Sequence, residues 1–141
     1  MLSKGMAHIL YNKLPKIDIN DLKVGDKVYI AYPAMVGWHT FRYPTFKEFT
    51  VKRITPKKTK IYLANETSSM ELTPSKTYFY QDCPELHQQN QIAQCAQECN
   101  RLIFKIDSNG QYLHRLSDDE FLEIHKLLTR SLEILEKAAN Q

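Results

Sequence analysis

The fold of this chain is decided by residues 21–65, which read DLKVGDKVYIAYPAMVGWHTFRYPTFKEFTVKRITPKKTKIYLAN. Within them Val28, Ile30 and Tyr32 occupy every second position. Such an alternation is typical of a half-buried strand, so these three side chains are predicted to face the core. The intervening residues, which are predicted to face away from the core, are Lys27, Tyr29 and Ala31.

The same reasoning predicts four further strands. The second strand covers residues 46–55, and a bulge near Arg53 explains a slip in its alternation. A hairpin turn at 56–59 separates it from the third strand. The later strands are predicted over 60–64, 70–72 and 77–80. The inward-facing side chains of the second and third strands are Phe49, Val51, Ile61 and Leu63.

Residues 33–45, which read PAMVGWHTFRYPT, are predicted to form one long loop between the first two strands. Two prolines and a glycine interrupt this segment, and Trp38, Phe41 and Tyr43 crowd it. A loop this rich in aromatic residues is costly unless the rings pack or bind. Two interpretations therefore stay open: Trp38 and Phe41 fold back to plug the strand layer, or the loop is a binding element.

The character of the chain changes at Asp82, where helical signals begin. Pro84 suits the first position of a helix. Apolar residues at three- and four-residue spacing then predict one amphipathic helix over 84–105. They are Ile92, Cys95, Ala96, Cys99, Leu102, Ile103 and Ile106. Because Asn109-Gly110 is a strong turn signal, a hairpin of 103–107 with 111–115 remains an alternative.

A second helix is predicted from Asp118 to about Ala138. Ser117 and Glu120 have the spacing of a capping box at its start. Its apolar stripe consists of Phe121, Ile124, Leu128, Leu132 and Leu135, and Leu122, Leu127 and Ile134 widen it. A helix that is apolar on more than one side packs against two surfaces. These are the first helix and either the strands or a second copy of the chain.

These elements predict an α+β protein with a small five-stranded SH3-like β-barrel followed by two antiparallel α-helices. The predicted parts are an N-terminal arm at 1–20, the barrel at 21–81 and the helical hairpin at 82–141. The order resembles small phage and prophage-type β-barrel proteins of unknown function. The resemblance rests on VGDKVYI at 24–30, FKEFTVKRI at 46–54, KIYL at 60–63 and LSDDEFLEIHKLL at 116–128. It implies an origin on a mobile genetic element and no catalytic residue.

The net charge of +3 conceals an asymmetry between the two parts of the chain. Residues 1–80 hold 13 Lys+Arg and 6 Asp+Glu, which gives +7, whereas residues 81–141 hold 6 and 10, which gives −4. The basic part is suited to a polyanion. In the alternative interpretation the two oppositely charged parts attract each other.

A binding face is predicted where the cations of the second and third strands meet the aromatic loop. Lysines there would contact phosphates, and the aromatic rings would stack on bases. The predicted binding residues are Trp38, Phe41, Arg42, Tyr43, Lys52, Arg53, Lys57, Lys58 and Lys60, with Lys47 beside them. In the alternative interpretation this is a solvated hairpin whose lysines protect edge strands from aggregation.

A group of cysteine and histidine residues has the composition of a zinc site. Cys83, His87, Cys95 and Cys99 are all suitable ligands. One continuous helix would hold Cys83 and Cys99 about 24 Å apart, which is too far for one metal ion. Unless the helix breaks near residues 89–91, no metal and no other cofactor is expected.

The remaining features predict a non-enzymatic protein of a reducing, cytoplasmic setting in the host cell. His39, His114 and His125 lie in no recognisable catalytic motif. Three cysteines are an odd number without the spacing of a disulfide framework. No apolar run approaches the length of a membrane span, so no membrane partner is expected.

The leading hypothesis is a phage- or prophage-type binding module that engages nucleic acid or a nucleoprotein through its basic, aromatic barrel face. The alternative is a phage-encoded inhibitor of a host defence enzyme, such as a CRISPR nuclease. It would act by protein–protein contact and use the aromatic loop as a hot spot. A homodimer through the helices is a further expectation.

Overall fold

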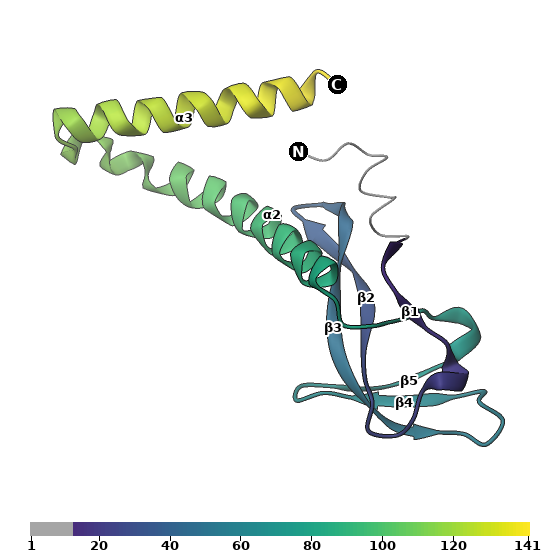
Figure 1. Ribbon diagram of the computed structural model, residues 1–141. Helices are drawn as coiled ribbons and strands as arrows, with labels where there is room; N and C mark the ends of the chain where they lie inside the picture. Colours follow the sequence, from purple (N-terminus) through teal and green to yellow (C-terminus); the bar gives the residue numbers. More distant parts are fainter. Residues whose placement is uncertain (1–12) are drawn as a thin grey trace. The chain divides into compact units, whose positions relative to one another are not determined.

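The computed structural model describes residues 13–141, apart from the side chains of residues 41–43 (Figure 1). The strands are β1 (Lys16–Ile17), β2 (Lys27–Val36), β3 (His39–Ile54), β4 (Ile61–Ala64), β5 (Ser69–Leu72) and β6 (Phe79–Tyr80). The helices are α2 (Pro84–Asn109) and α3 (Asp118–Ala139), with short 3-10 turns at Ile19–Asp21, Pro74–Lys76 and Gly110–Arg115. The chain divides into two compact units inside α2, one ending at Asn100 and the other covering Arg101–Gln141.

The described strands form one open antiparallel sheet in the order β1-β6-β2-β3-β4-β5. The α+β class is therefore confirmed, but the five-stranded SH3-like barrel is wrong. A barrel closes when its two edge strands pair with each other. Here β1 pairs only with β6, and β5 pairs only with β4, among the residues that the structure describes.

The predicted strands lie close to their observed positions. A register shift between Val51 and Arg53 confirms the predicted bulge in the second strand. The last two predicted strands correspond to β5 and the shorter β6. Of the predicted N-terminal arm, Ile17 pairs with Phe79 in the sheet, and residues 1–12 lie outside the described part.

One face of the sheet carries the larger hydrophobic cluster, called here the inner cluster. It contains Leu22, Val28, Ile30, Phe49, Val51, Ile61, Leu63 and Phe79, with Tyr32 packed against it. The sequence predicted the inward orientation of the residues from β2, β3 and β4 among these, and the structure confirms it. The alternation of β2, β3 and β4 is therefore a reliable guide to this face.

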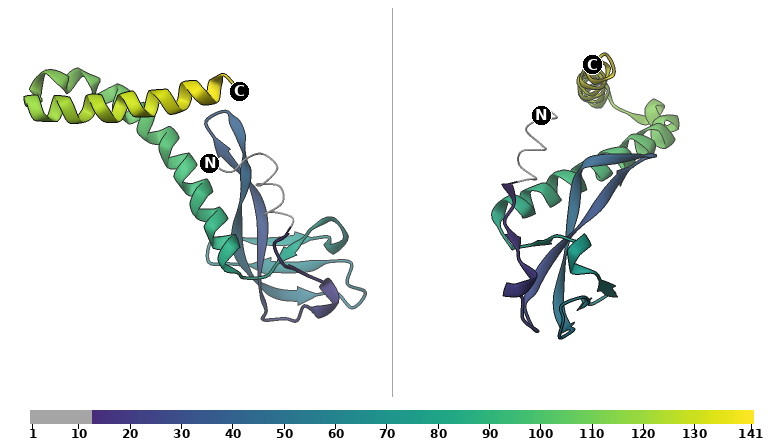
Figure 2. Two further views of the ribbon diagram at one scale, coloured as in Figure 1. Left: turned by 45° about the horizontal axis from the view of Figure 1, so that its top comes forward. Right: turned by 90° about the vertical axis from the view of Figure 1, so that its right-hand side faces the viewer.

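The opposite face carries a second, outer cluster, which the sequence did not predict. It contains Leu14, Tyr29, Phe46, Tyr80 and Leu86, with Ala31 and Cys83 packed against it. The prediction that Tyr29 and Ala31 point away from any core is wrong. Leu86 at the start of α2 packs in this cluster, so the sheet is buried on both sides over these residues. Figure 2 shows the path of α2 from its start beside the sheet.

The segment predicted as a loop at 33–45 is instead the outer part of a long β-hairpin. The strands β2 and β3 pair from Lys27 opposite Thr50 as far as Val36 opposite His39, with one register shift between. Pro33 and Pro44 fall where the register shifts, between the pairs Tyr32–Thr45 and Ala34–Phe41. Proline is tolerated there because no ladder hydrogen bond is required of it.

Both predicted helices are present. The helix α2 begins at Pro84 and continues to Asn109, so the alternative hairpin of 103–107 with 111–115 is wrong. The predicted capping box is confirmed, because Ser117 Oγ accepts from the Glu120 N–H and Glu120 Oε1 accepts from the Ser117 N–H. Within the described residues, no helix is long and apolar enough to cross a membrane.

Candidate binding site

The end of the β2–β3 hairpin is a two-residue turn formed by Gly37 and Trp38. Gly37 has a φ of +63°, in the left-handed region that glycine adopts without steric cost. A glycine at the first of two central positions is the signature of a tight hairpin turn that matches the twist of its strands. Trp38 is 96% exposed at this tip. The prediction that Trp38 folds back as a plug is therefore wrong.

The helix α2 braces this hairpin through the side chains of Asn90 and Gln97. The Asn90 side-chain amide forms two hydrogen bonds with the backbone of Phe46, as a neighbouring strand would. Its Oδ1 accepts from the Phe46 N–H at 2.6 Å, and its Nδ2 donates to the Phe46 carbonyl at 3.0 Å. Near the tip, Gln97 Nε2 donates to the Met35 carbonyl at 3.1 Å. A Cβ atom on Gly37 would lie 3.4 Å from Asn100 Oδ1. The exposed tryptophan is thus presented on a supported hairpin.

The predicted basic residues lie at the other end of β3 and beyond it. Lys57 and Lys58 belong to the turn between β3 and β4 and are exposed. Lys58 has a φ of 56°, and its Nζ donates to Asn20 Oδ1 at 2.9 Å. Lys52 lines an open cavity of about 630 Å³ next to Lys27 and Glu48.

Other predicted cations are engaged within the protein. The Lys60 ammonium lies 3.2 Å from Glu71 Oε1. The Arg53 guanidinium lies 5.3 Å from the centre of the Tyr62 ring. The Lys47 ammonium lies 4.6 Å from the centre of the Tyr32 ring. Such contacts orient a charge without removing it from solvent, so these residues still contribute to the positive potential.

The structure does not bring the predicted aromatic and basic residues together on one face. Trp38 precedes β3, whereas Lys57 and Lys58 follow it, and β3 has 16 residues. A straight strand of that length measures about 50 Å. The side chains of Phe41, Arg42 and Tyr43 lie outside the described residues. The predicted single face is therefore two separate regions, which we call the hairpin tip (Met35, Gly37 and Trp38) and the basic turn (Lys57 and Lys58).

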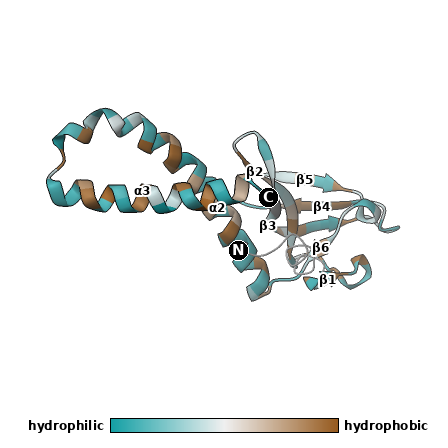
Figure 3. Ribbon diagram, turned by 90° about the horizontal axis from the view of Figure 1, so that it is seen from above, coloured by the Kyte–Doolittle hydropathy of each residue, from teal (hydrophilic) through white to brown (hydrophobic). Residues whose placement is uncertain are grey.

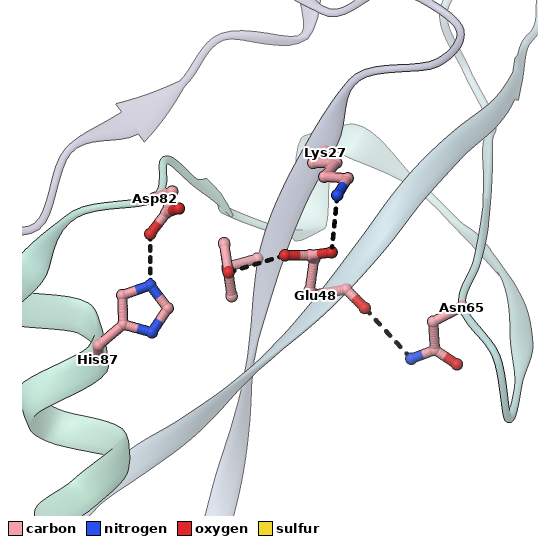
Figure 4. A network of polar contacts seen from close by, with 6 residues as sticks. Lys27, Glu48, Asn65, Asp82 and His87 are labelled. Atoms are coloured by element: carbon pink, nitrogen blue, oxygen red, sulfur yellow. Dashed lines mark hydrogen bonds and ion pairs between the residues drawn. The ribbon is translucent and has the colours of Figure 1, made fainter.

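A polar network beside the outer cluster was not predicted from the sequence (Figure 4). Tyr29 Oη donates to Glu48 Oε2 at 2.9 Å, and Lys27 Nζ lies 3.5 Å from Glu48 Oε1. The ring of His87 meets the Tyr29 ring edge-on, with centroids 5.6 Å apart, and His87 also contacts Asp82. The sequence signal that could have indicated this network is Glu48, which is the only acidic residue in β3.

The contacts of this network fix the position of the Glu48 carboxylate between Tyr29 and Lys27. Burial, together with the hydrogen bond to Glu48, raises the pKa of Tyr29 from 10.0 to about 12. A tyrosine with such a pKa keeps its hydroxyl proton at neutral pH. It therefore donates a hydrogen bond and does not act as a base. The network is therefore suited to holding Glu48 beside Lys27.

The candidate zinc ligands follow the path of α2. The helix has no break from Pro84 to Asn109, including at residues 89–91, so Cys83 and Cys99 are not brought together. In residues 13–141 no group of three potential ligands among His, Cys, Asp and Glu converges on one point. The histidines His39, His114 and His125 lie on three different elements, namely β3, the turn at 110–115 and α3.

Comparison with known proteins found no matching family model, no similar curated protein and no similar solved structure. The resemblance to small phage proteins therefore stays a prediction, and the functional argument rests on this chain alone.

Proposed function

We propose that this chain is a non-enzymatic binding module that uses the β2–β3 hairpin as its binding arm and takes nucleic acid as its ligand. The observation that carries the proposal is the position of Trp38. It is almost fully exposed at the end of a hairpin that α2 braces through Asn90 and Gln97. A tryptophan that is held in solvent on a supported turn is available to stack on a nucleic-acid base.

The shape and charge of the sheet support nucleic acid as the ligand. A two-stranded β-ribbon fits the major groove of duplex DNA. The charge of +7 over residues 1–80 would attract the phosphate backbone. The hairpin tip and the basic turn lie beyond opposite ends of β3, whose 16 residues span at most about 50 Å, or roughly 15 base pairs of duplex DNA. An extended polyanion can reach both regions at once, whereas a compact ligand cannot.

The test is a titration of the protein with single- and double-stranded oligonucleotides, followed by Trp38 fluorescence at low and at physiological salt. We expect quenching that weakens as the salt concentration rises, because phosphate binding releases counterions. No change in fluorescence at either salt concentration would reject the proposal.

Two matched variants separate the two regions in this titration. Lys57→Gln combined with Lys58→Asn is expected to weaken binding and to reduce the salt slope by about 0.9 for each phosphate that is no longer neutralised. Asparagine is chosen because it tolerates the left-handed backbone of Lys58. Trp38→Ala, followed by anisotropy of a labelled oligonucleotide, is expected to weaken binding with an unchanged slope. Lys137→Gln in α3 is the control and is expected to change neither quantity.

A second candidate is supported by the apolar character of the tip. Trp38 in the turn and the half-exposed Met35 at the end of β2 are both apolar and accessible, as the anchor residues of protein interfaces are. The chain would then be a phage-encoded inhibitor of a host defence enzyme such as a CRISPR nuclease. In that case Trp38→Ala abolishes inhibition of DNA cleavage by the purified nuclease, while the lysine variants mainly slow association. Loss of inhibition in the lysine variants alone would argue against this candidate.

A further inference from the structure

The unit formed by Arg101–Gln141 has no buried core of its own. None of its residues is buried. Its large apolar side chains that are more than two fifths exposed are Leu102, Ile103, Phe104, Ile106, Tyr112, Leu113, Phe121, Leu122, Leu127, Leu128, Leu132, Ile134 and Leu135. Helices of this size are marginal in water without tertiary packing. This apolar surface therefore requires a cover.

The spacing of these residues indicates that the cover is helical. Phe121, Leu128 and Leu135 recur every seven residues along α3, and Leu127 and Ile134 repeat the interval beside them. Figure 3 shows hydrophobic residues recurring along this helix. A seven-residue apolar repeat keeps one seam of a helix facing a partner helix, as in coiled coils and four-helix bundles.

The described residues of the other compact unit show few exposed apolar side chains. In its described residues, the large apolar side chains that are well exposed are Val24, Met35, Trp38 and Tyr78. They stand singly on separate turns and strands. By contrast, the unit 101–141 presents a long apolar helix face. A second copy of the same face would be a suitable surface to pack against it.

The charge of α3 argues against a lipid surface as the cover. The helix carries six acidic residues and three basic residues. Helices that lie on anionic membranes are rich in lysine and arginine on their polar face. The acidic excess also disfavours nucleic acid on this side of the protein.

We propose that residues 101–141 of two copies of this chain pack face to face and form a homodimeric helical bundle. The contact is the α3 stripe, which consists of Phe121, Ile124, Leu128, Leu132 and Leu135. This stripe and the other exposed apolar side chains of residues 101–141 together present on the order of 1,000 Å² per chain, against about 800 Å² per partner in a stable interface of standard size. A two-fold axis pairs the same stripe with itself, so each copy covers the other.

Sedimentation equilibrium of the full chain tests the proposal. The wild type is expected at twice the chain mass of 16.5 kDa. Leu128→Glu combined with Leu135→Glu places charge in the stripe and is expected to halve the measured mass. Thr129→Glu is the matched control, because Thr129 is an exposed polar residue of α3 outside the apolar stripe. A wild type at the chain mass, or a dimer that survives the double substitution, overturns the proposal.

A second measurement covers the case in which the double variant loses its helices. Thermal melting of the wild type, followed by helical circular dichroism, depends on protein concentration if folding and association are linked. We expect the melting midpoint to rise with concentration. A midpoint that does not change with concentration contradicts the dimer, whatever the variants do.

Discussion

The two compact units of this chain treat their apolar side chains in opposite ways. In the described residues up to Asn100, an inner and an outer cluster bury both faces of the sheet. From Arg101 onwards no residue is buried, although the helices there are equally apolar along one side. The sheet unit is therefore stabilised by its own contacts. The helical unit has the residues of a core but buries none of them within itself.

The largest expected difference comes from the same substitution made in each unit. Phe49 is 1% exposed in the inner cluster, and Phe104 is 66% exposed on α2. Phe49→Ala leaves a cavity and should lower the free energy of unfolding by about 3–5 kcal/mol. Phe104→Ala should change it by no more than about 0.5 kcal/mol. Urea unfolding followed by circular dichroism measures both, and equal losses would contradict the comparison.

The next effect concerns the bracing of the hairpin by α2. Asn90→Ala removes both hydrogen bonds to Phe46 and leaves its backbone N–H and carbonyl without these partners. The expected loss of unfolding free energy is about 2 kcal/mol. Gln91→Ala, at an exposed position one residue later, is the control and should have little effect. If the two variants are equally stable in urea, Asn90 does not hold the hairpin.

A gain in stability is expected at a buried amide on the same helix. Gln89 is 3% exposed, and neither its Oε1 nor its Nε2 has a hydrogen-bond partner in the described structure. Gln89→Met keeps the length of the side chain and removes the unpaired polar atoms. We expect the free energy of unfolding to rise by about 1–2 kcal/mol. A lower urea midpoint in this variant would show that the amide has a partner after all.

The smallest effect is a pH dependence of the sheet unit. Because the pKa of Tyr29 is raised in the folded state, its contribution to stability is present below pH 10 and is lost as pH rises from 10.0 to about 12. Burial also raises the pKa of Tyr32, which adds to the same loss. Tyr29→Phe should make the urea midpoint fall less steeply in this range. Tyr78→Phe, at an exposed tyrosine, should leave the slope unchanged, and an equal slope in all three proteins would contradict the assignment.

Local patterns in the sequence were sufficient for most elements of secondary structure. The alternation of Val28 and Ile30 identified the inner face of β2, and the slip before Ile54 identified the bulge. The capping box at Ser117 located the start of α3. These signals depend on neighbours a few residues apart, so they can be read without knowledge of the fold.

The errors share one cause, which is contact between distant segments. Tyr29 has the position of an outward residue, and the outer cluster, to which Leu14 and Leu86 come from distant segments, makes it a core residue. Pro33 and Pro44 suggested a loop because proline interrupts a regular strand. In the structure both prolines fall at the same register shift between β2 and β3, and this pairing cannot be predicted from the sequence around either proline. The signal that could have revealed the hairpin is the two-residue Gly37-Trp38 turn between Val36 and His39.

The candidate site was affected in the same way. The sequence places Trp38 and Lys57 within one basic and aromatic stretch, and the 16 residues of β3 separate them in space. What the sequence by itself determined is the set of strands and helices, the inner face of the sheet and the apolar repeat of α3, because these are periodic and local. Only the tertiary structure decided that the sheet stays open with two buried faces, that α2 braces the hairpin and that the unit 101–141 has no buried residue of its own. Each of these depends on which surfaces meet, and surfaces meet through residues far apart in the chain.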